Sequence, residues 1–222
     1  MTGAMHDSED RRDALMLVTL RHVPFDGWTH RAVHAGAEEL GLDAAGADNL
    51  LPGGPAEAMA LFHNWADRQM LAALEREAPA DLRIREKAAL ALKLRLRICL
   101  PFREAVRQGV SFLAQPHHAP LGAKLTWRTV DAIWHALGDR AADFNYYTKR
   151  GLLMAVYGSA AMYWLADRSP DCSATEAFID RRIADVMQVP KAMGRLREVA
   201  AKLPNPFRLF RRPRGTRSYR GY

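Results

Sequence analysis

Apolar residues recur at helical spacing along most of this 222-residue chain, and no array of alternating strands accompanies them. The clearest stretch is Pro55–Arg76, where proline opens a helix and one face carries Met59, Phe62, Ala66, Met70 and Leu74. Residues Leu92–Ile98 alternate as a strand would. Their flanks are strong helix formers and no partner strand is visible, so we predict helix here too. The pattern predicts an all-α protein of about nine to ten helices around one core.

Breaks at Gly and Pro suggest where the helices lie. We expect a helix at Asp10–His22 that ends before Pro24, and a helix at Leu82–Leu100 capped by Asp81. In the second of these helices, Lys93, Arg95 and Arg97 should extend from a buried surface to solvent. The predicted organisation is a disordered N-terminus at 1–9, helix-turn-helix-like small helices at 10–50, a helical body at 51–189, an amphipathic basic helix at 190–203 and a basic disordered tail at 204–222.

Composition indicates a soluble protein of a reducing compartment. Hydrophobic residues make up 49% and charged residues 26%. Cys99 and Cys172 form no CxxC and no disulfide framework. The acidic start has no apolar signal core, and the charge-free run Gly151–Ala166 is too short to span a bilayer. We therefore expect a cytoplasmic location.

Positive charge is concentrated at the C-terminal end. Residues 191–222 hold ten Lys or Arg and one Glu, which gives +9, whereas the other 190 residues sum to −2. Such a tail favours an anionic surface as partner. Apolar residues flanked by arginines are typical of an interfacial membrane anchor. The predicted membrane-binding residues are Met193, Leu196, Val199, Phe207, Arg208, Arg211 and Arg212. The alternative is a helix docked on its own domain, followed by a solvated tail.

No arrangement of residues indicates catalysis, a cofactor or a metal. Phosphate-loop, dinucleotide and nucleophile-elbow motifs do not occur, nor does the E-x-x-H of a di-iron bundle. His30 and His34 share a helix face with Glu38, but a solvated polar face explains them more simply. His117 and His118 lie in a loop and match no ligand spacing. We predict a protein that is not an enzyme, with no cofactor and no metal site.

DNA binding is disfavoured by charge. Residues 32–67, which would contain a recognition helix, have no Lys or Arg and six acidic residues. Duplex DNA binding depends on neutralising phosphates, so an acidic element would be repelled. We expect no specific nucleic-acid partner, although a transcriptional regulator with a small-molecule pocket stays open as the alternative function.

The most specific motif is DFNYYTKR at 143–150, preceded by WHALGD and followed by GLLMAVYGSAAMYWLADRS. Two further stretches, HVPFDGWTHRAVHAGAEELG at 22–41 and TEAFIDRRIADV at 175–186, accompany it. Together the three resemble the ubiquinone (coenzyme Q) biosynthesis accessory lipid-binding proteins, the Coq-nine family. In that family most members have Trp where this chain has Tyr146.

The resemblance implies a TetR-like fold, with three small N-terminal helices followed by a larger helical body that encloses an apolar cavity. It implies an isoprenoid quinone-type lipid as ligand and, by analogy with TetR-like proteins, a homodimer. It also implies peripheral attachment to the inner membrane of a bacterium. Residues at helical spacing that suit either a core or the implied cavity are Leu94, Ile98, Phe102, Trp127, Val130, Trp134, Met154, Tyr157 and Met162.

The same motif implies a surface for a partner protein, which in the family is a di-iron hydroxylase acting late in ubiquinone synthesis. Tyr146 and Tyr147 point about 100° apart on a helix, so at least one should be exposed. The predicted patch comprises Ile133, Leu137, Asp143, Tyr146 and Tyr147. From the residues alone, packing of the tyrosines beneath the preceding loop is an equal alternative. Small residues that permit close approach in the core or at a dimer seam are Gly151, Ala155, Gly158, Ser159 and Ala161.

Overall fold

The computed structural model describes residues 2–138 and 144–186, and every element in them is helical. The helices are α1 (Thr2–Asp26), α2 (His30–Glu39), α3 (Ala44–Leu50), α4 (Gly54–Glu77), α5 (Ile84–Cys99), α6 (Arg103–Leu113), α7 (Ala119–Ala136), α8 (Phe144–Ala166) and α9 (Ser173–Val186), with 3₁₀ turns at Leu100–Phe102 and Pro170–Cys172. The chain divides into two compact units at Ile183, and only 184–186 of the second unit are described. The all-α prediction is confirmed.

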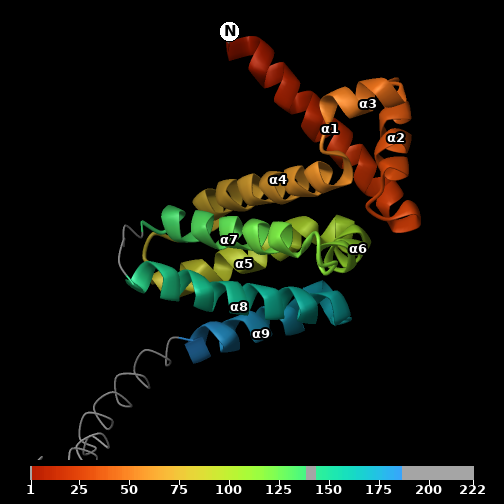
Figure 1. Ribbon diagram of the computed structural model, residues 1–222. Helices are drawn as coiled ribbons and strands as arrows, with labels where there is room; N and C mark the ends of the chain where they lie inside the picture. The colour runs from red at the N-terminus through yellow and green to blue at the C-terminus, as the bar shows by residue number, and fades with distance from the viewer. Residues whose placement is uncertain (1, 139–143, 187–222) are drawn as a thin grey trace, which may run out of the picture. The chain divides into compact units, whose positions relative to one another are not determined.

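The first three helices form a small N-terminal group (Figure 1). Thr29 caps α2 by accepting a hydrogen bond from the amide of Ala32, and Asp43 caps α3 in the same way through the amide of Gly46. Helices α1 and α2 approach closely at Gly36, where a Cβ atom would lie 2.9 Å from the backbone nitrogen of Thr19. Glycine at this position therefore sets the spacing of the two helices.

Helix α1 is longer at both ends than the sequence suggested. It begins at Thr2, where we expected disorder over 1–9, and it continues through Pro24 to Asp26. Proline removes one hydrogen bond to the preceding turn and its ring crowds the carbonyl four residues earlier, and α1 continues for only two residues beyond Pro24. Burial of Val23 and Trp28 on either side stabilises this extension.

The larger body is layered. Helices α4, α7 and α8 lie one below another in Figure 1, and α5 packs against all three. Met59, Phe62, Ala66, Met70 and Leu74 of α4 are all buried, which confirms the predicted stripe. Arg103 donates to the carbonyl of Trp164, and Arg107 donates to that of Leu165 at 2.7 Å. These bonds satisfy carbonyls in the last turn of α8, where the carbonyl of Trp164 also accepts from the amide of Asp167.

The body differs from the prediction in where two helices begin and in where one arginine side chain lies. Helix α5 begins at Ile84 with Arg83 as its cap, paired to Glu86, so Asp81 is not the cap. Helix α7 begins at Ala119, directly after His117 and His118 of the predicted loop, because Pro120 suits a first helical turn. Arg95 does not extend to solvent as expected: it is 1% exposed.

Candidate functional site

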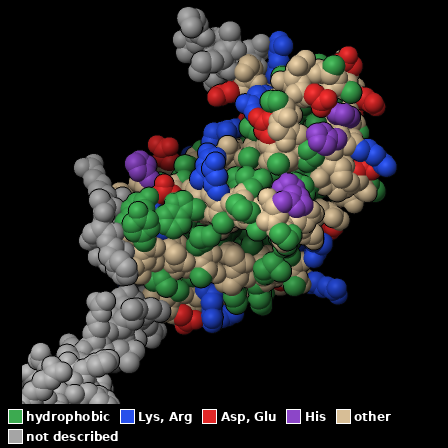
Figure 2. All heavy atoms as spheres, viewed as in Figure 1, with side chains coloured by type: hydrophobic (Ala, Val, Ile, Leu, Met, Phe, Trp, Pro, Cys, Tyr) green, Lys and Arg blue, Asp and Glu red, His purple; other side chains and the backbone are tan. Residues whose placement is uncertain are grey.

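The predicted lipid-lining residues lie on helices α5, α7 and α8 of the body and, for Phe102, in the 3₁₀ turn after α5. Leu94, Val130 and Tyr157 are buried. The same predicted set includes the partly buried side chains Ile98, Phe102, Trp127, Trp134 and Met154. Met162 is 56% exposed, because it lies on the opposite face of α8 from buried Tyr157, and it does not fit an enclosed cavity. Hydrophobic side chains also gather over α7 and α8 on the face seen in Figure 2.

Trp134 carries an unusual polar atom in this apolar setting. Its indole Nε1 is buried and has no hydrogen-bond acceptor among the described residues. The ammonium of Lys149 on α8 lies 5.6 Å from the centre of the Trp134 ring. A buried donor without an acceptor costs about 1–3 kcal/mol, so an oxygen-bearing ligand reaching this position would recover that energy. The sequence pattern predicted Trp134 as a lining residue, but it did not predict that the indole N–H would lack an acceptor.

A polar network that the sequence did not reveal lies at the centre of the body. Arg95 of α5 donates from Nε to Asp67 of α4 at 2.8 Å and from Nη1 to the sulfur of Cys99 at 2.7 Å. Thr129 of α7 donates to the same carboxylate at 3.0 Å. Three helices therefore meet at one buried carboxylate. The signal that would have found it is the polar residue Asp67 on the apolar stripe of α4.

Burial shifts the acid–base behaviour of the groups around Arg95. Burial raises the pKa of Asp67, and the hydrogen bonds from Arg95 and Thr129 oppose the shift. Burial also raises the pKa of the Cys99 thiol and raises that of Tyr157 to about 12, so both stay protonated at neutral pH. Thiol and phenol in this state are poor nucleophiles, and the arrangement is structural.

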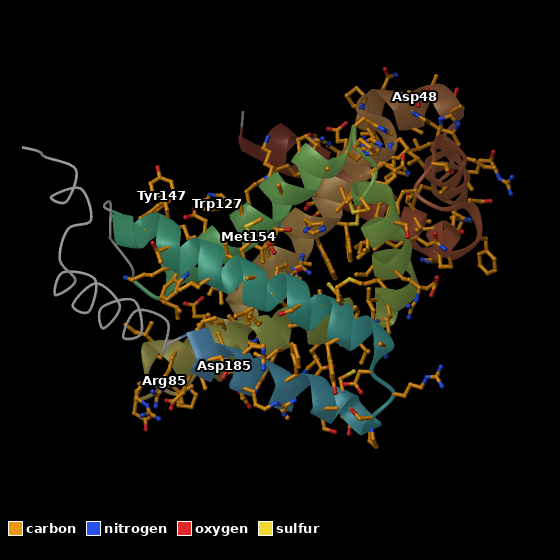
Figure 3. All side chains as sticks on the ribbon, turned by 60° about the horizontal axis from the view of Figure 1, so that its bottom comes forward. Asp48, Arg85, Trp127, Tyr147, Met154 and Asp185 are labelled. Carbon is orange, nitrogen blue, oxygen red and sulfur yellow. The ribbon has the colours of Figure 1, made fainter. Side chains whose placement is uncertain are left out.

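An aromatic cluster joins α7 to the start of α8. The ring centres of Trp127 and Tyr147 are 6.1 Å apart, and those of Tyr146 and Tyr147 are 5.1 Å apart. Tyr147 is 64% exposed, and Figure 3 shows Trp127 and Tyr147 side by side where the two helices meet, with Met154 further along α8. The prediction that one of the two tyrosines is exposed is confirmed, and that tyrosine is Tyr147.

Tyr146 turns back into the protein. Its hydroxyl donates to Asp131 of α7 at 3.0 Å, and Arg150 donates to the same carboxylate from Nε at 2.5 Å. The guanidinium carbon of Arg150 also lies 3.4 Å from the centre of the Tyr146 ring. Tyr146, Asp131 and Arg150 thus fix the first turns of α8 on α7, and they hold Tyr147 in its exposed position. Asp131 and Arg150 were missed because their partnership crosses two helices.

The remaining predicted site residues are in part buried, in part at the surface and in part outside the described residues. Ile133 is fully buried, because it occupies the inner face of α7, and it does not contribute to a surface patch. Leu137 is partly buried at the end of α7. Asp143 lies outside the described residues. So do the predicted membrane-binding residues Met193, Leu196, Val199, Phe207, Arg208, Arg211 and Arg212. None of the helices in 2–138 and 144–186 combines the length and hydropathy that crossing a bilayer requires.

Comparison with solved structures identifies the fold. A structure described as the TetR transcriptional regulator from Nitrosomonas europaea ATCC 19718 superposes with a TM-score of 0.66. The match covers 80% of this chain and 98% of that one at 20% sequence identity. The TetR-like fold implied by the sequence motifs is therefore confirmed.

Sequence comparison identifies the family. The model of the COQ9 family matches residues 119–190, which contain the aromatic cluster. The chain is 32% identical over 192 residues to the ubiquinone biosynthesis protein COQ9, mitochondrial, of Homo sapiens. This match covers 83% of this chain and 60% of the human protein. It is 31% identical to COQ9-B of Xenopus laevis, with 85% of this chain and 67% of that protein covered. Although it spans about 60% of the length of the human, bovine and rat relatives, the chain belongs to the COQ9 family.

Proposed function

We propose that this protein is a lipid-binding accessory protein of ubiquinone biosynthesis. In this proposal it is not an enzyme: it binds an isoprenoid quinone precursor at a membrane and presents it to a hydroxylase. The observation that carries the proposal is the 192-residue match to a relative named as a ubiquinone biosynthesis protein. That match includes the helices α5, α7 and α8 on which the candidate site is built.

The interior of α5, α7 and α8 supports the lipid part of the proposal. The lining residues that are buried are aliphatic or aromatic, as an isoprenoid tail requires. The indole N–H of Trp134, which has no acceptor among the described residues, is a donor suited to a quinone or phenol oxygen. A largely apolar lining with this donor at Trp134 fits a ligand with a long tail and a small polar head.

The aromatic cluster supports presentation to a partner. Tyr147 is exposed beside Trp127, and its neighbour Tyr146 is bonded to Asp131, which also pairs with Arg150. Exposed aromatic side chains of this kind dominate the energy of protein interfaces. We propose that Tyr147 and Trp127 form the centre of the hydroxylase-binding surface, with Leu137 at its edge.

A second face of α8 supports a homodimer. Gly151, Ala155, Gly158 and Met162 follow helical spacing, and all four are exposed. A Cβ atom added at Gly151 or Gly158 would meet no atom within 4 Å. Small residues on an open helix face allow a second helix to approach closely, so we propose that this face packs on its copy in the dimer.

We propose peripheral attachment to the inner membrane of a bacterium through the cationic segment 190–222, although the relatives are named as mitochondrial. The segment holds the +9 charge, which suits an anionic leaflet. The rival function is a transcriptional regulator, because the fold is TetR-like. Flotation with liposomes containing about one-third anionic lipid, together with a gel shift against genomic DNA fragments, separates the two. Flotation without a sequence-specific shift supports the proposal, and the reverse result would support the regulator.

A further inference from the structure

The N-terminal helices bring together three metal-ligating side chains that the lipid-binding proposal does not use. His30 and His34 stand one turn apart on α2, and Asp48 reaches them from α3. One ligand atom from each residue lies within 4.8 Å of the other two. Figure 3 shows Asp48 far from Trp127, Tyr147 and Met154, so this cluster is separate from the candidate lipid and partner sites.

Each side chain of the cluster is already held in position. His34 Nε2 and Asp48 Oδ1 are 3.0 Å apart, which fixes both groups across the gap between α2 and α3. The ring of His30 lies over Gly54, where an added Cβ would come within 2.5 Å of its Cε1 atom. Gly54 has a φ of +56°, so glycine is favoured there on two grounds, and its missing side chain leaves the space that the His30 ring occupies.

We propose that His30, His34 and Asp48 bind a divalent transition-metal ion of the zinc class. Two imidazole nitrogens and one carboxylate oxygen suit Zn²⁺ and its neighbours Cu²⁺, Ni²⁺ and Co²⁺, whereas Mg²⁺ and Ca²⁺ prefer oxygen ligands alone. Imidazoles at positions i and i+4 share one helix face, which is the spacing that zinc-binding helices use. Water would complete the coordination, because Asp48 is 56% exposed and His34 is 32% exposed.

Small side-chain movements close the site. Two ligand atoms on a tetrahedral zinc lie roughly 3.3–3.5 Å apart, so atoms within 4.8 Å of one another reach this arrangement by rotation about side-chain bonds. The ion would replace the His34–Asp48 hydrogen bond with a bridge between α2 and α3. Since α3 has seven residues, such a bridge would hold a short helix in a fixed orientation.

Zinc titration of the full chain tests the proposal. We would measure Zn²⁺ binding by calorimetry after chelator treatment, together with the zinc-induced change in Tm. The proteins compared are the native chain, His34→Gln, the triple variant His30→Gln/His34→Gln/Asp48→Asn, and the control His117→Gln/His118→Gln. The control removes a second close histidine pair, whose rings are 4.0 Å apart, from the loop before α7.

The expected result is one Zn²⁺ equivalent in the native chain and in the control, with a raised Tm in both. His34→Gln should weaken binding at least about tenfold, and the triple variant at least about 100-fold. Circular dichroism without metal establishes that each variant is folded, and Co²⁺ absorption reports the histidine ligands. The proposal is overturned if the native chain binds no Zn²⁺ at micromolar concentration. It is equally overturned if the triple variant binds as well as the native chain, or if the control abolishes binding.

Discussion

The guanidinium of Arg95 on α5 donates a 2.8 Å hydrogen bond to the carboxylate of Asp67 on α4 inside the helical body. Thr129 of α7 donates to the same carboxylate, so one acceptor positions three helices. This geometry fixes how α4, α5 and α7 sit beside the apolar interior in which we place the lipid. The energetic consequences can be tested in the protein without ligand.

Removal of Asp67 should be strongly destabilising. Asp67→Ala leaves the charge of Arg95 buried without its partner, which costs about 3–5 kcal/mol of unfolding free energy. The double variant Asp67→Leu/Arg95→Met removes both charges and should recover most of that loss. Urea unfolding at neutral pH measures both variants. If Asp67→Ala loses less unfolding free energy than the double variant, the Arg95–Asp67 pair does not stabilise the body.

His63 should make the protein acid-sensitive. Burial lowers its pKa to about 3, with repulsion from Arg95 and Arg128 adding to the effect. The folded protein therefore binds this proton less readily than the unfolded chain, whose histidine titrates near 6.5. Stability from neutral His63 is complete above pH ~6.5 and falls as pH decreases from there towards about 3, by roughly 2 kcal/mol at pH 5.

The comparison of His63→Gln with His117→Gln isolates this effect. His117 is exposed in the loop before α7, so its variant should keep the acid-sensitivity of the native chain. When the pH is lowered from 7 to 5, the unfolding free energy of His63→Gln should fall by about 2 kcal/mol less than that of the native chain. Urea unfolding at the two pH values measures this difference. Equal pH dependence in both variants would assign the acid-sensitivity to other groups.

Local patterns predicted the helices well, while pairings across helices were not predictable. The stripe Met59–Leu74 was correct in full, because burial along one helix repeats with the helical period. Arg95 was misplaced, because the alternating pattern of 92–98 does not say which basic residue meets a carboxylate. The exposure of Tyr147 and the half-buried position of Tyr146 depend on Asp131, which is fifteen residues from Tyr146 and on another helix.

Trp134→Phe tests the proposed headgroup donor. The change removes the indole N–H but keeps an aromatic ring, so retention of a quinone-type lipid should fall at least about tenfold. Stability without lipid should stay the same or rise, because an unsatisfied buried donor is lost. The matched change Trp28→Phe, at a buried tryptophan outside the predicted lining, should leave lipid retention unaltered. Equal lipid loss in both variants would indicate a general effect on packing rather than a hydrogen bond.

Tyr147→Ala should weaken binding of the hydroxylase at least about tenfold, or ~1.4 kcal/mol, at unchanged Tm. The side chain is 64% exposed, so its removal leaves no cavity in the core. Phe25→Ala serves as the control, because Phe25 is 89% exposed and lies on α1. Surface plasmon resonance with the purified hydroxylase gives both affinities. An unaltered affinity for Tyr147→Ala would assign this tyrosine to packing.

Deletion of residues 190–222 should leave unit Met1–Ile183 folded and reduce flotation with anionic vesicles sharply. Raising salt in the full chain should remove the contribution of Arg208, Arg211 and Arg212, because exposed charges are screened beyond about 8 Å at physiological ionic strength. Substitution of Leu196, Val199 and Phe207 by Ser should remove a contribution that salt does not affect. Equal flotation of the truncated and full-length proteins would exclude this segment as the anchor.

Native mass spectrometry of the full chain, purified gently from its host membranes, tests the central claim most directly. The account predicts a bound species whose added mass matches an isoprenoid quinone precursor, with occupancy reduced in Trp134→Phe and preserved in Trp28→Phe. A chain that carries no isoprenoid lipid, and that takes up none when purified ubiquinone precursor is added, would contradict it.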